Sequence, residues 1–236
     1  MIVTIDGPAG AGKSTVARLL ARRLGLPCLN SGFIYRTVTF LAIERAAAKD
    51  CSLEEWFGQR EQVIELVEGL EISFRDEPAL DEKESGRTLV FAGGREVSGN
   101  LKDSEVTSNI WRVADDGEYR LGLLELQRSF SRDPGVVAEG RDMGSVVFPD
   151  AALKFYLDAS PAERARRRSG EGPSAGAGAT YEEILAAIEA RDSRDRERAD
   201  SPLVIPEGAL IVNSDGWTVE QTVDYLGGEV DKKRSG

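Results

Sequence analysis

Short apolar runs rich in β-branched residues alternate along the chain with longer stretches in which apolar residues recur every three or four positions. The first run, Ile2–Ile5, predicts a strand, and the stretch that follows, Ser14–Leu24, predicts an amphipathic helix. Further strands are predicted at residues 27–29, 136–138, 153–157 and 210–212. Strands that alternate with helices form parallel sheets, so we expect an α/β fold with three layers, α/β/α, around a central parallel sheet.

The loop between the first strand and the first helix is rich in glycine. Residues 6–15 read DGPAGAGKST, in which Gly7, Gly12, Lys13 and Ser14 fit the pattern G-x-x-x-x-G-K-[ST] of a phosphate-binding loop (P-loop). The glycines let the backbone wrap around an anion, the lysine reaches the β- and γ-phosphates of a nucleotide, and the serine hydroxyl can bind Mg²⁺. Strand, glycine loop and helix in this order predict a site for a nucleoside triphosphate.

The regular alternation stops between residues 50 and 103. The elements predicted there are one helix opened by a Ser52–Glu55 capping box and carrying Trp56 and Val63, strands at 71–75 and 88–92, and a Gly93–Gly94 turn into residues 95–97. The charged stretch 75–87 is expected to be a loop or a solvated hairpin. Residues 50–105 hold 15 Asp and Glu against 6 Lys and Arg, so most of the net charge of −11 lies there. We therefore predict a peripheral, acidic α+β insert.

The second half of the chain returns to strands and helices. Residues 104–130 are predicted to be mostly helical with a break near 115–117, and Ser160, Thr180 and Thr218 each begin a segment with the spacing of a capping box. Residues 169–180 are small, polar and rich in glycine, which suits a lid over a phosphate site or a plain surface loop. The polar tail from about Gly227 is expected to fray.

The composition limits the possible chemistry. The chain has 236 residues and no histidine, which excludes His-containing catalytic triads and His-ligated metal sites. No apolar run approaches the roughly 18 residues of a membrane span, and the N-terminus enters the first strand directly. We therefore expect a cytoplasmic protein without a signal peptide or membrane partner. The net charge argues against a nucleic-acid partner, the isolated Cys28 and Cys51 argue against a disulfide framework, and a monomer is expected.

Arginines gather in the second half, where residues 164–198 hold eight Arg and no Lys. Arg191, Asp195 and Arg198 stand at i, i+4 and i+7, so they share one face of a predicted helix. This face is either a site for an anion or a solvated surface with ion pairs.

Two further candidate sites follow strands. Arg141 and Asp142 come after the buried run 136–138, at the carboxyl end of a strand, where ligands gather in open α/β sheets. Ser31 and Arg36 follow the second strand and form either a second anion site or an ordinary capped helix with a surface arginine.

Together these motifs resemble those of the nucleoside monophosphate kinases, and most closely those of the bacterial cytidylate kinases. The resemblance covers nearly the whole chain and is specific at GRDMG followed by VVFP, with R-D-x-R-D-R-x-R downstream. The segments that carry it are TIDGPAGAGKST (4–15), LNSGFIYR (29–36), EGRDMGSVVFPDA (139–151), ERARRR (163–168) and RDSRDRERADSPL (191–203). The chain departs from the family's pattern at Asn30, Phe33 and Trp111.

The resemblance implies ATP and Mg²⁺ as ligands and assigns residues to them. The predicted ATP ligands are Gly7, Pro8, Ala9, Gly10, Ala11, Gly12, Lys13, Ser14 and Thr15, with Ser14 also on the metal and with Arg164, Arg167 and Arg168 closing over the phosphates. The predicted CMP ligands are Ser31, Arg36, Arg141, Arg191, Asp195 and Arg198 around the phosphate and ribose, and Arg120 and Asp142 at the base. The implied catalytic residues are Lys13, Arg141, Arg168 and Arg198.

The same resemblance implies an organisation and a reaction. The expected divisions are a P-loop core at 1–36, 104–163 and 200–236, an acidic subdomain for the nucleoside monophosphate (NMP) at 37–103, and a short lid with an arginine-rich helix at 164–199. The implied reaction transfers the γ-phosphoryl group of ATP to CMP or dCMP, in pyrimidine nucleotide metabolism. Cytosine is favoured over uracil because its amino group suits a carboxylate. The alternatives are a kinase for another small acceptor and a nucleotide-binding module without turnover.

Overall fold

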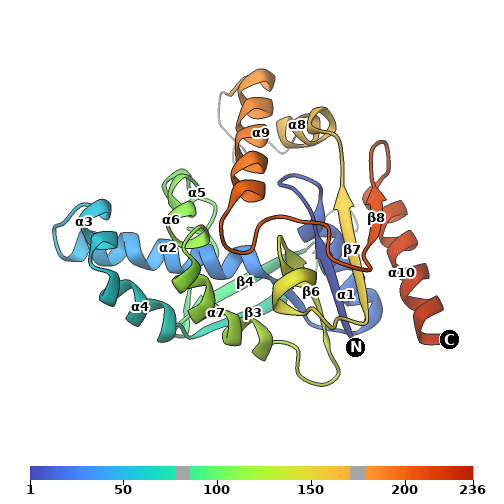
Figure 1. Cartoon of the computed structure of the whole chain (residues 1–236), viewed down its shortest axis with the longest axis horizontal. Coiled ribbons are helices and arrows are strands. Elements are labelled where there is room, and N and C mark those ends of the chain that lie inside the picture. Colours follow the sequence, from blue (N-terminus) through green and yellow to red (C-terminus); the bar gives the residue numbers. More distant parts are fainter. Residues whose placement is uncertain (78–85, 171–178, 236) are drawn as a thin grey trace. The chain divides into compact units, whose positions relative to one another are not determined.

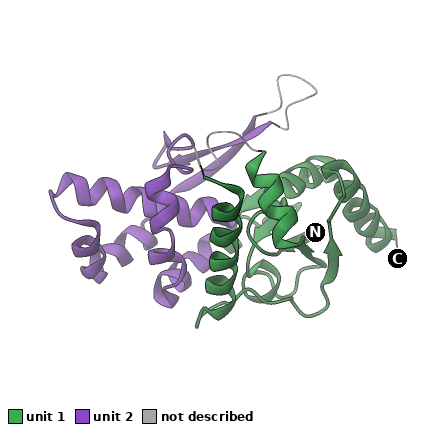
Figure 2. Ribbon diagram, turned by 90° about the horizontal axis from the view of Figure 1, so that it is seen from above, with its two compact units in different colours: residues 1–30, 127–236 green, residues 31–126 purple. Residues whose placement is uncertain are grey.

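The computed structural model describes residues 1–77, 86–170 and 179–235. The chain divides into two compact units, residues 1–30 with 127–236 and residues 31–126 (Figure 2). The second unit is wider than the insert predicted at 37–103, because residues 31–36 and 104–126 group with it. Most of the predicted lid at 169–180, and the centre of the charged stretch 75–87, lie outside the described residues.

The first unit contains a five-stranded sheet in the order β2-β6-β1-β7-β8 (Figure 1). All four strand pairs are parallel. The strands are β1 (Ile2–Asp6), β2 (Cys28–Asn30), β6 (Val136–Gly140), β7 (Leu153–Asp158) and β8 (Leu210–Asn213). The helices are α1 (Lys13–Leu24), α8 (Pro161–Ser169), α9 (Tyr181–Glu197) and α10 (Val219–Ser235), with a π-helical turn η1 (Met143–Val147). The predicted α/β fold around a parallel sheet is confirmed.

Strand β1 shows how the sheet is covered on both faces. Its alternate residues Val3 and Ile5 are fully buried in a core shared with α1 and α10. Thr4 and Asp6 point to the opposite face, since side chains alternate along a strand, and there they approach Gly144 of η1. Because both faces of the sheet are covered, even the polar Thr4 and Asp6 of this strand are buried.

The C-terminal segment corrects one expectation. The tail from Gly227 does not fray, since α10 continues to Ser235. Val230 is fully buried in the core formed with Leu20 of α1 and Leu226 of α10. An apolar residue one turn beyond the glycines therefore fixes the end of the helix against the sheet.

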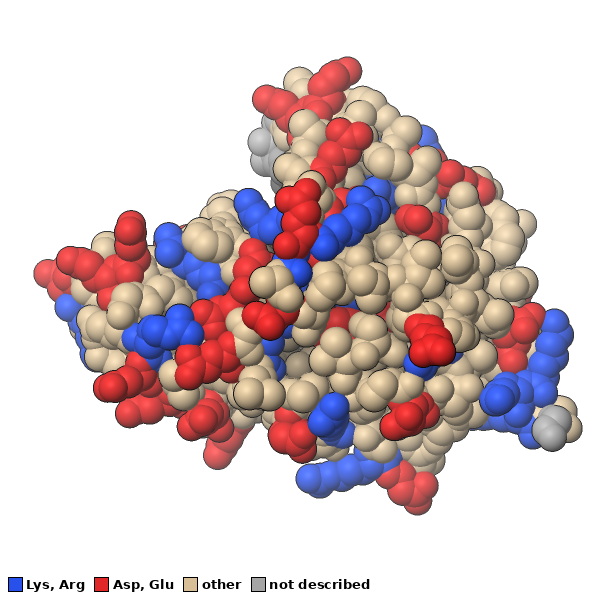
Figure 3. All heavy atoms as spheres, viewed as in Figure 1, with Lys and Arg blue, Asp and Glu red and all other residues tan. Residues whose placement is uncertain are grey.

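The second unit combines helices with a three-stranded antiparallel sheet. Its helices are α2 (Ser31–Ala48), α3 (Leu53–Gly58), α4 (Arg60–Glu68), α5 (Ser104–Asn109), α6 (Trp111–Ala114) and the start of α7 (Gly117–Ser129). Its strands are β3 (Ile72–Glu77), β4 (Arg87–Ala92) and β5 (Arg95–Glu96), and the predicted turn at Gly93–Gly94 has positive φ at both glycines. Figure 3 shows acidic side chains exposed over α3 and α4, in agreement with the predicted acidic insert.

The prediction of one continuous helix after Ser52 is wrong. The segment is divided into α3 and α4 at Gln59, whose φ of −91° and ψ of 70° lie outside the helical region. Gly58 precedes this break, and glycine is a weak helix former. The Ser52 capping box itself is confirmed.

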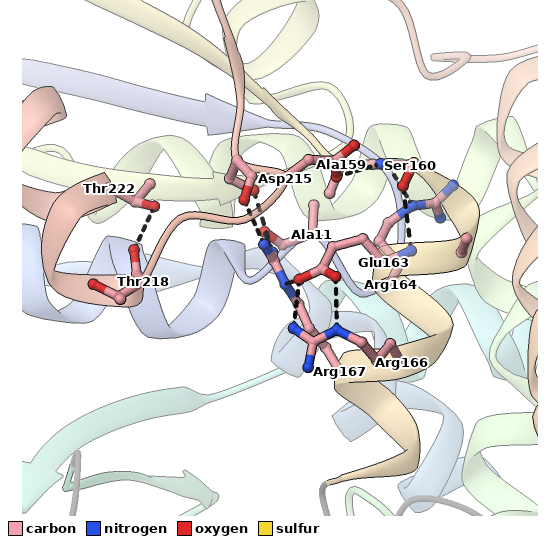
Figure 4. Close-up of polar contacts among 12 residues, drawn as sticks. Ala11, Ala159, Ser160, Glu163, Arg164, Arg166, Arg167, Asp215, Thr218 and Thr222 are labelled. Carbon is pink, nitrogen blue, oxygen red and sulfur yellow. Dashed lines mark hydrogen bonds and ion pairs between the residues drawn. The ribbon is translucent and has the colours of Figure 1, made fainter.

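The other predicted capping boxes differ in outcome. Those at Thr180 and Thr218 are complete, with reciprocal hydrogen bonds. At Ser160 only half is present, because the Glu163 carboxylate binds Arg166 and Arg167 instead of the Ser160 N–H (Figure 4). That N–H donates to Asp215 at 2.8 Å, so the start of α8 is tied to the loop after β8.

Two smaller expectations concern cysteines and membranes. Neither Cys28 nor Cys51 forms a disulfide. Within the described ranges, no helix is both long enough and apolar enough to cross a membrane.

The packing of α10 generates a prediction about stability. We expect Val230→Ala to lower the free energy of unfolding by about 2 kcal/mol, since each buried CH₂ is worth about 0.8 kcal/mol and a cavity remains. The matched control is Lys233→Ala on the exposed side of the same helix, expected to change it by less than about 0.5 kcal/mol. Urea unfolding measures both, and equal effects would mean that the last turns of α10 are not packed.

Candidate active site

The glycine loop joins β1 to the N-terminus of α1. Gly7 lies so close to β7 that a Cβ atom there would be 2.0 Å from the carbonyl oxygen of Leu157. Gly12 caps α1 with a φ of 87°, a conformation that favours glycine, and the first turn of α1 has neither a side-chain cap nor an acidic residue. The free N–H groups and the helix dipole therefore point positive charge at the loop, which suits an anion.

Lys13 lies beneath this loop with its side chain almost fully buried. Its ammonium group donates a hydrogen bond to the carbonyl oxygen of Pro8 at 2.7 Å. Burial, reinforced by the positive charge of Arg141, lowers the pKa of Lys13 from 10.5 to about 7. A nearby anion would favour the charged lysine and raise this pKa again.

The hydroxyl group of Ser14 is in contact with a carboxylate of β6, the strand that pairs with β1. It donates to Oε1 of Glu139 at 2.6 Å, and Asn30 Nδ2 donates to the same hydroxyl oxygen at 3.2 Å. Hydroxyl, carboxylate and phosphate oxygens are the ligands that Mg²⁺ prefers, and this metal is held by few protein groups beside substrate phosphates. The described residues contain no cluster of three or more His, Cys, Asp or Glu that could hold a metal. Ser14 and Glu139 thus fit a metal shared with a nucleotide.

Asp6, the last residue of β1, holds the turn that follows β6. Its carboxylate accepts the backbone N–H groups of Met143 at 2.8 Å and Gly144 at 2.7 Å. Burial raises the pKa of Asp6 to about 7, although these two N–H groups act in the opposite direction. A Cβ atom on Gly144 would lie 2.7 Å from Thr4 Oγ1, so only glycine fits here. Asp142, which is buried, directly precedes this turn. The two hydrogen bonds to Asp6 hold the turn in place.

Arginines from two segments meet at one carboxylate. Asp195 of α9 binds Arg141 Nε at 2.7 Å and Arg198 Nη2 at 2.5 Å. Burial raises the pKa of Asp195, but the positive charges of Arg141, Arg191 and Arg198 outweigh this and leave the pKa below its usual value. Arg191 and Asp195 lie on α9, whereas Arg198 is its C-cap with a ψ of 133°, so the three residues do not share one helical face as predicted. Arg198 nevertheless reaches Asp195, and an anion site here stays a prediction.

Arg167 lies over the glycine loop. Its guanidinium binds Glu163, the carbonyl oxygen of Ser214 at 2.6 Å, and more weakly the carbonyl oxygen of Ala11 at 3.4 Å (Figure 4). Its Nη1 is 3.8 Å from where a Cβ atom on Gly12 would lie. This position is compatible with the predicted role at the ATP phosphates, which stays a prediction. Arg168 is half-buried, and its side chain makes no hydrogen bond or ion pair with any described residue.

Arg164 is buried beside the glycine loop. Its side chain is 2% exposed and pairs with Asp192 at 2.7 Å. It also donates to the carbonyl oxygens of Ala159 and Ala9, both at 2.9 Å. The N–H of Ala9, a predicted ATP ligand, donates to Asp192 at 3.3 Å. Arg164 thus supports the backbone of the glycine loop, and its predicted role at the ATP phosphates stays a prediction.

Three predicted CMP ligands belong to the second unit. Ser31 is buried at the start of α2, and Arg36 donates to the carbonyl oxygen of Leu101 at 2.6 Å and to Thr107 Oγ1 at 2.9 Å. Arg120 is 6% exposed and lies 5.1 Å from the centre of the Tyr35 ring. Trp111, in contrast, is 40% exposed. The roles of these residues in binding CMP stay predictions.

Three site residues were missed at the level of the sequence: Asp6, Glu139 and Asp192. Asp6 and Glu139 each end a buried strand run, and a carboxylate in that position was a usable signal. Asp192 continues the buried stripe of Ile184 and Ile188 along α9. An acidic residue on an apolar stripe signals a buried partner, although the sequence gives no means of naming Arg164 as that partner.

The chain is similar to several known proteins. Among solved structures, a shikimate kinase from Bacteroides thetaiotaomicron covers 98% of both chains with 16% identity and a TM-score of 0.44. A cytidylate kinase from Pasteurella multocida (strain Pm70) is 39% identical over 223 residues, which are 94% of this chain and 92% of the relative. A cytidylate kinase from Marinomonas sp. (strain MWYL1) is 38% identical over 231 residues, 98% of this chain and 96% of the relative. The family model described as cytidylate kinase matches residues 3–232, and the chain therefore belongs to the cytidylate kinase family.

Proposed function

We propose that the protein transfers the γ-phosphoryl group of ATP to CMP or dCMP, giving ADP and CDP or dCDP. The observation that carries the proposal is that one unit contains both a glycine loop over an uncapped helix N-terminus and the Arg141–Asp195–Arg198 cluster. The first suits the phosphates of a donor, and the second suits the phosphate of an acceptor. Membership of the cytidylate kinase family supports CMP as that acceptor.

On the donor side, the loop from Gly7 to Thr15 would bind the ATP phosphates, with Arg167 and Arg168 above it. Ser14 and Glu139 would hold Mg²⁺, which supplies charge neutralisation between the β- and γ-phosphates when bound. Lys13 would form its charged state next to the phosphates, where its ammonium group can stabilise the transferring group.

On the acceptor side, Arg141, Arg191 and Arg198 would bind the CMP phosphate, and Ser31 and Arg36 are also predicted to bind it. Asp142 and Arg120 would bind the base. Cytosine presents an amino donor and two acceptors, and a carboxylate beside a guanidinium satisfies both kinds of group. Uracil has a carbonyl in place of the amine and would leave the carboxylate unpaired.

The chemistry requires no histidine. The acceptor phosphate is already anionic, so no side chain has to remove a proton from it. Catalysis would come from holding the acceptor oxygen in line with the γ-phosphorus, and from Lys13, Arg141, Arg168 and Arg198 stabilising the charge that spreads over the transferring group. We further propose that the protein acts as a monomer in the cytoplasm, in pyrimidine nucleotide metabolism.

The first prediction concerns base selection. We expect the protein to phosphorylate CMP and dCMP in preference to UMP and AMP in an ADP-release assay, and Asp142→Ala to lower the preference for CMP over UMP by roughly ten- to hundred-fold. The control is Asp150→Ala, which alters an exposed carboxylate shortly after the same turn. Equal ADP release with and without any monophosphate would contradict the kinase proposal, and unchanged selectivity of Asp142→Ala would move base recognition elsewhere.

The second prediction concerns the metal. Glu139→Gln keeps the size of the side chain and an acceptor for the Ser14 hydroxyl but removes the charge. We expect it to raise the Mg²⁺ concentration needed for half-maximal activity by roughly 10- to 100-fold. Titration of the rate with Mg²⁺ measures this, with Glu207→Gln at an exposed carboxylate as the control. A parallel response of the two variants would exclude Glu139 from the metal site.

The third prediction follows from the pKa of Lys13, which burial lowers to about 7. At pH 8.5 the free protein therefore holds Lys13 mostly neutral, and the bound phosphates raise its pKa, so ATP binding takes up close to one proton. Calorimetry in two buffers of different ionisation enthalpy measures this uptake. We expect it to disappear in Lys13→Met and to persist in Lys154→Met, and uptake that survives in Lys13→Met would refute the assignment.

A further inference from the structure

A buried ion pair holds both peptide groups of one residue in the glycine loop. Asp192 accepts the N–H of Ala9 at 3.3 Å, and Arg164 donates to the carbonyl oxygen of Ala9 at 2.9 Å. The two side chains pair with each other at 2.7 Å and are 3% and 2% exposed. Both peptide groups of Ala9 are therefore held, the N–H by Asp192 of α9 and the carbonyl oxygen by Arg164 of α8.

Arg164 also lies close to Gly10, the next residue of the loop. A Cβ atom on Gly10 would lie 3.3 Å from Cβ of Arg164, and Gly10 has a φ of 79°. Arg164 uses a third contact, to the carbonyl oxygen of Ala159, to fix itself at the start of α8. The loop backbone at residues 9–10 thus cannot move without disturbing the Arg164–Asp192 pair.

One member of the pair, Asp192, lies on α9, the helix that also carries Arg191. Asp192 directly follows Arg191, and Asp195 comes one turn later on α9. Asp195 accepts a hydrogen bond from Arg141 Nε at 2.7 Å. The helix that holds Asp192 against the donor loop therefore also holds the carboxylate that binds an arginine of the acceptor cluster.

We propose that the Arg164–Asp192 pair couples the two halves of the site, so that occupation of the glycine loop by ATP tightens the binding of CMP. Both are positioning residues, since their side chains bind each other and the peptide groups of Ala9, and they act through Ala9 and through α9. The inference rests on the proposed function for the identity of the two ligands. It goes beyond that function in assigning a thermodynamic coupling to this buried pair.

A purely structural role for the pair predicts a different result. Removing one partner leaves a buried charge alone and destabilises the protein, whereas replacing both by apolar residues of similar volume is often neutral or stabilising. The double variant Arg164→Met with Asp192→Leu should therefore fold, yet it cannot bind the peptide groups of Ala9. If the pair only held the fold together, a stable double variant would behave like the parent.

The experiment measures the affinity for CMP by calorimetry, without and with a saturating non-hydrolysable ATP analogue. In the parent we expect the analogue to tighten CMP binding by roughly fivefold or more, within the usual range for coupled sites. In Arg164→Met with Asp192→Leu we expect this factor to fall close to one at a melting temperature near that of the parent. The control removes the exposed Lys232–Glu229 pair on α10 by Lys232→Gln with Glu229→Gln, and should leave the factor unchanged.

The outcomes separate this inference from the proposed function. A parent that binds CMP without coupling, or a folded double variant that keeps the coupling, overturns the inference alone. A parent that binds no CMP overturns the proposed function and the inference with it. If the double variant fails to fold, Asp192→Asn takes its place: its amide can still accept the N–H of Ala9 but loses the charge that pairs with Arg164. Coupling retained in Asp192→Asn overturns the inference, and coupling lost supports it.

Discussion

The in-register parallel pairing of β1 with β6 is the constraint on which the site depends. The pairing places Ile5 beside Glu139 and Asp6 beside Gly140. Because both strands end at the same edge of the sheet, the glycine loop and the Arg141–Asp142 segment leave that edge together. The short contacts of Ser14 with Glu139 and of Asp6 with Met143 and Gly144 follow directly from this register. A shift of β6 by one residue would turn Glu139 to the face opposite Ser14.

The side chains of β1 point alternately to the two faces of the sheet, and each face has a different role. One face gives Val3 and Ile5 to the core with α1 and α10, and the other gives Thr4 and Asp6 to the turn at η1. Stability and chemistry are thus supplied by neighbouring residues of one strand. A buried carboxylate on such a strand is costly, and Asp6 offsets that cost by accepting two backbone N–H groups that would otherwise lack partners.

The sequence was sufficient for those features that depend on local spacing. The strands, the glycine loop, the hairpin turn at Gly93–Gly94 and the capping boxes at Ser52, Thr180 and Thr218 all follow from residues a few positions apart. Contacts between distant segments could not be derived in this way. The ion pair that buries Arg164 joins it to Asp192, which is 28 positions away in the sequence. The same limit applies to Glu139, whose partner Ser14 is 125 positions away in the sequence.

In the free protein the charged state of Lys13 is disfavoured. A ligand that favours this charged state would bind well, so the sign of the charge indicates what kind of ligand to expect. Burial lowers the pKa of Lys13 to about 7, and the neighbouring positive charges of Arg141 and Arg191 act in the same direction. A cation would worsen this repulsion and a neutral ligand would leave it in place, whereas a phosphate would relieve it. Around Asp195, the positive charges of Arg141, Arg191 and Arg198 keep the pKa of this carboxyl group below its usual value in spite of its burial. The charges around Lys13 therefore suit an anion before any anion binds, and this is the physical support for the proposal that the glycine loop holds the phosphates of a nucleotide.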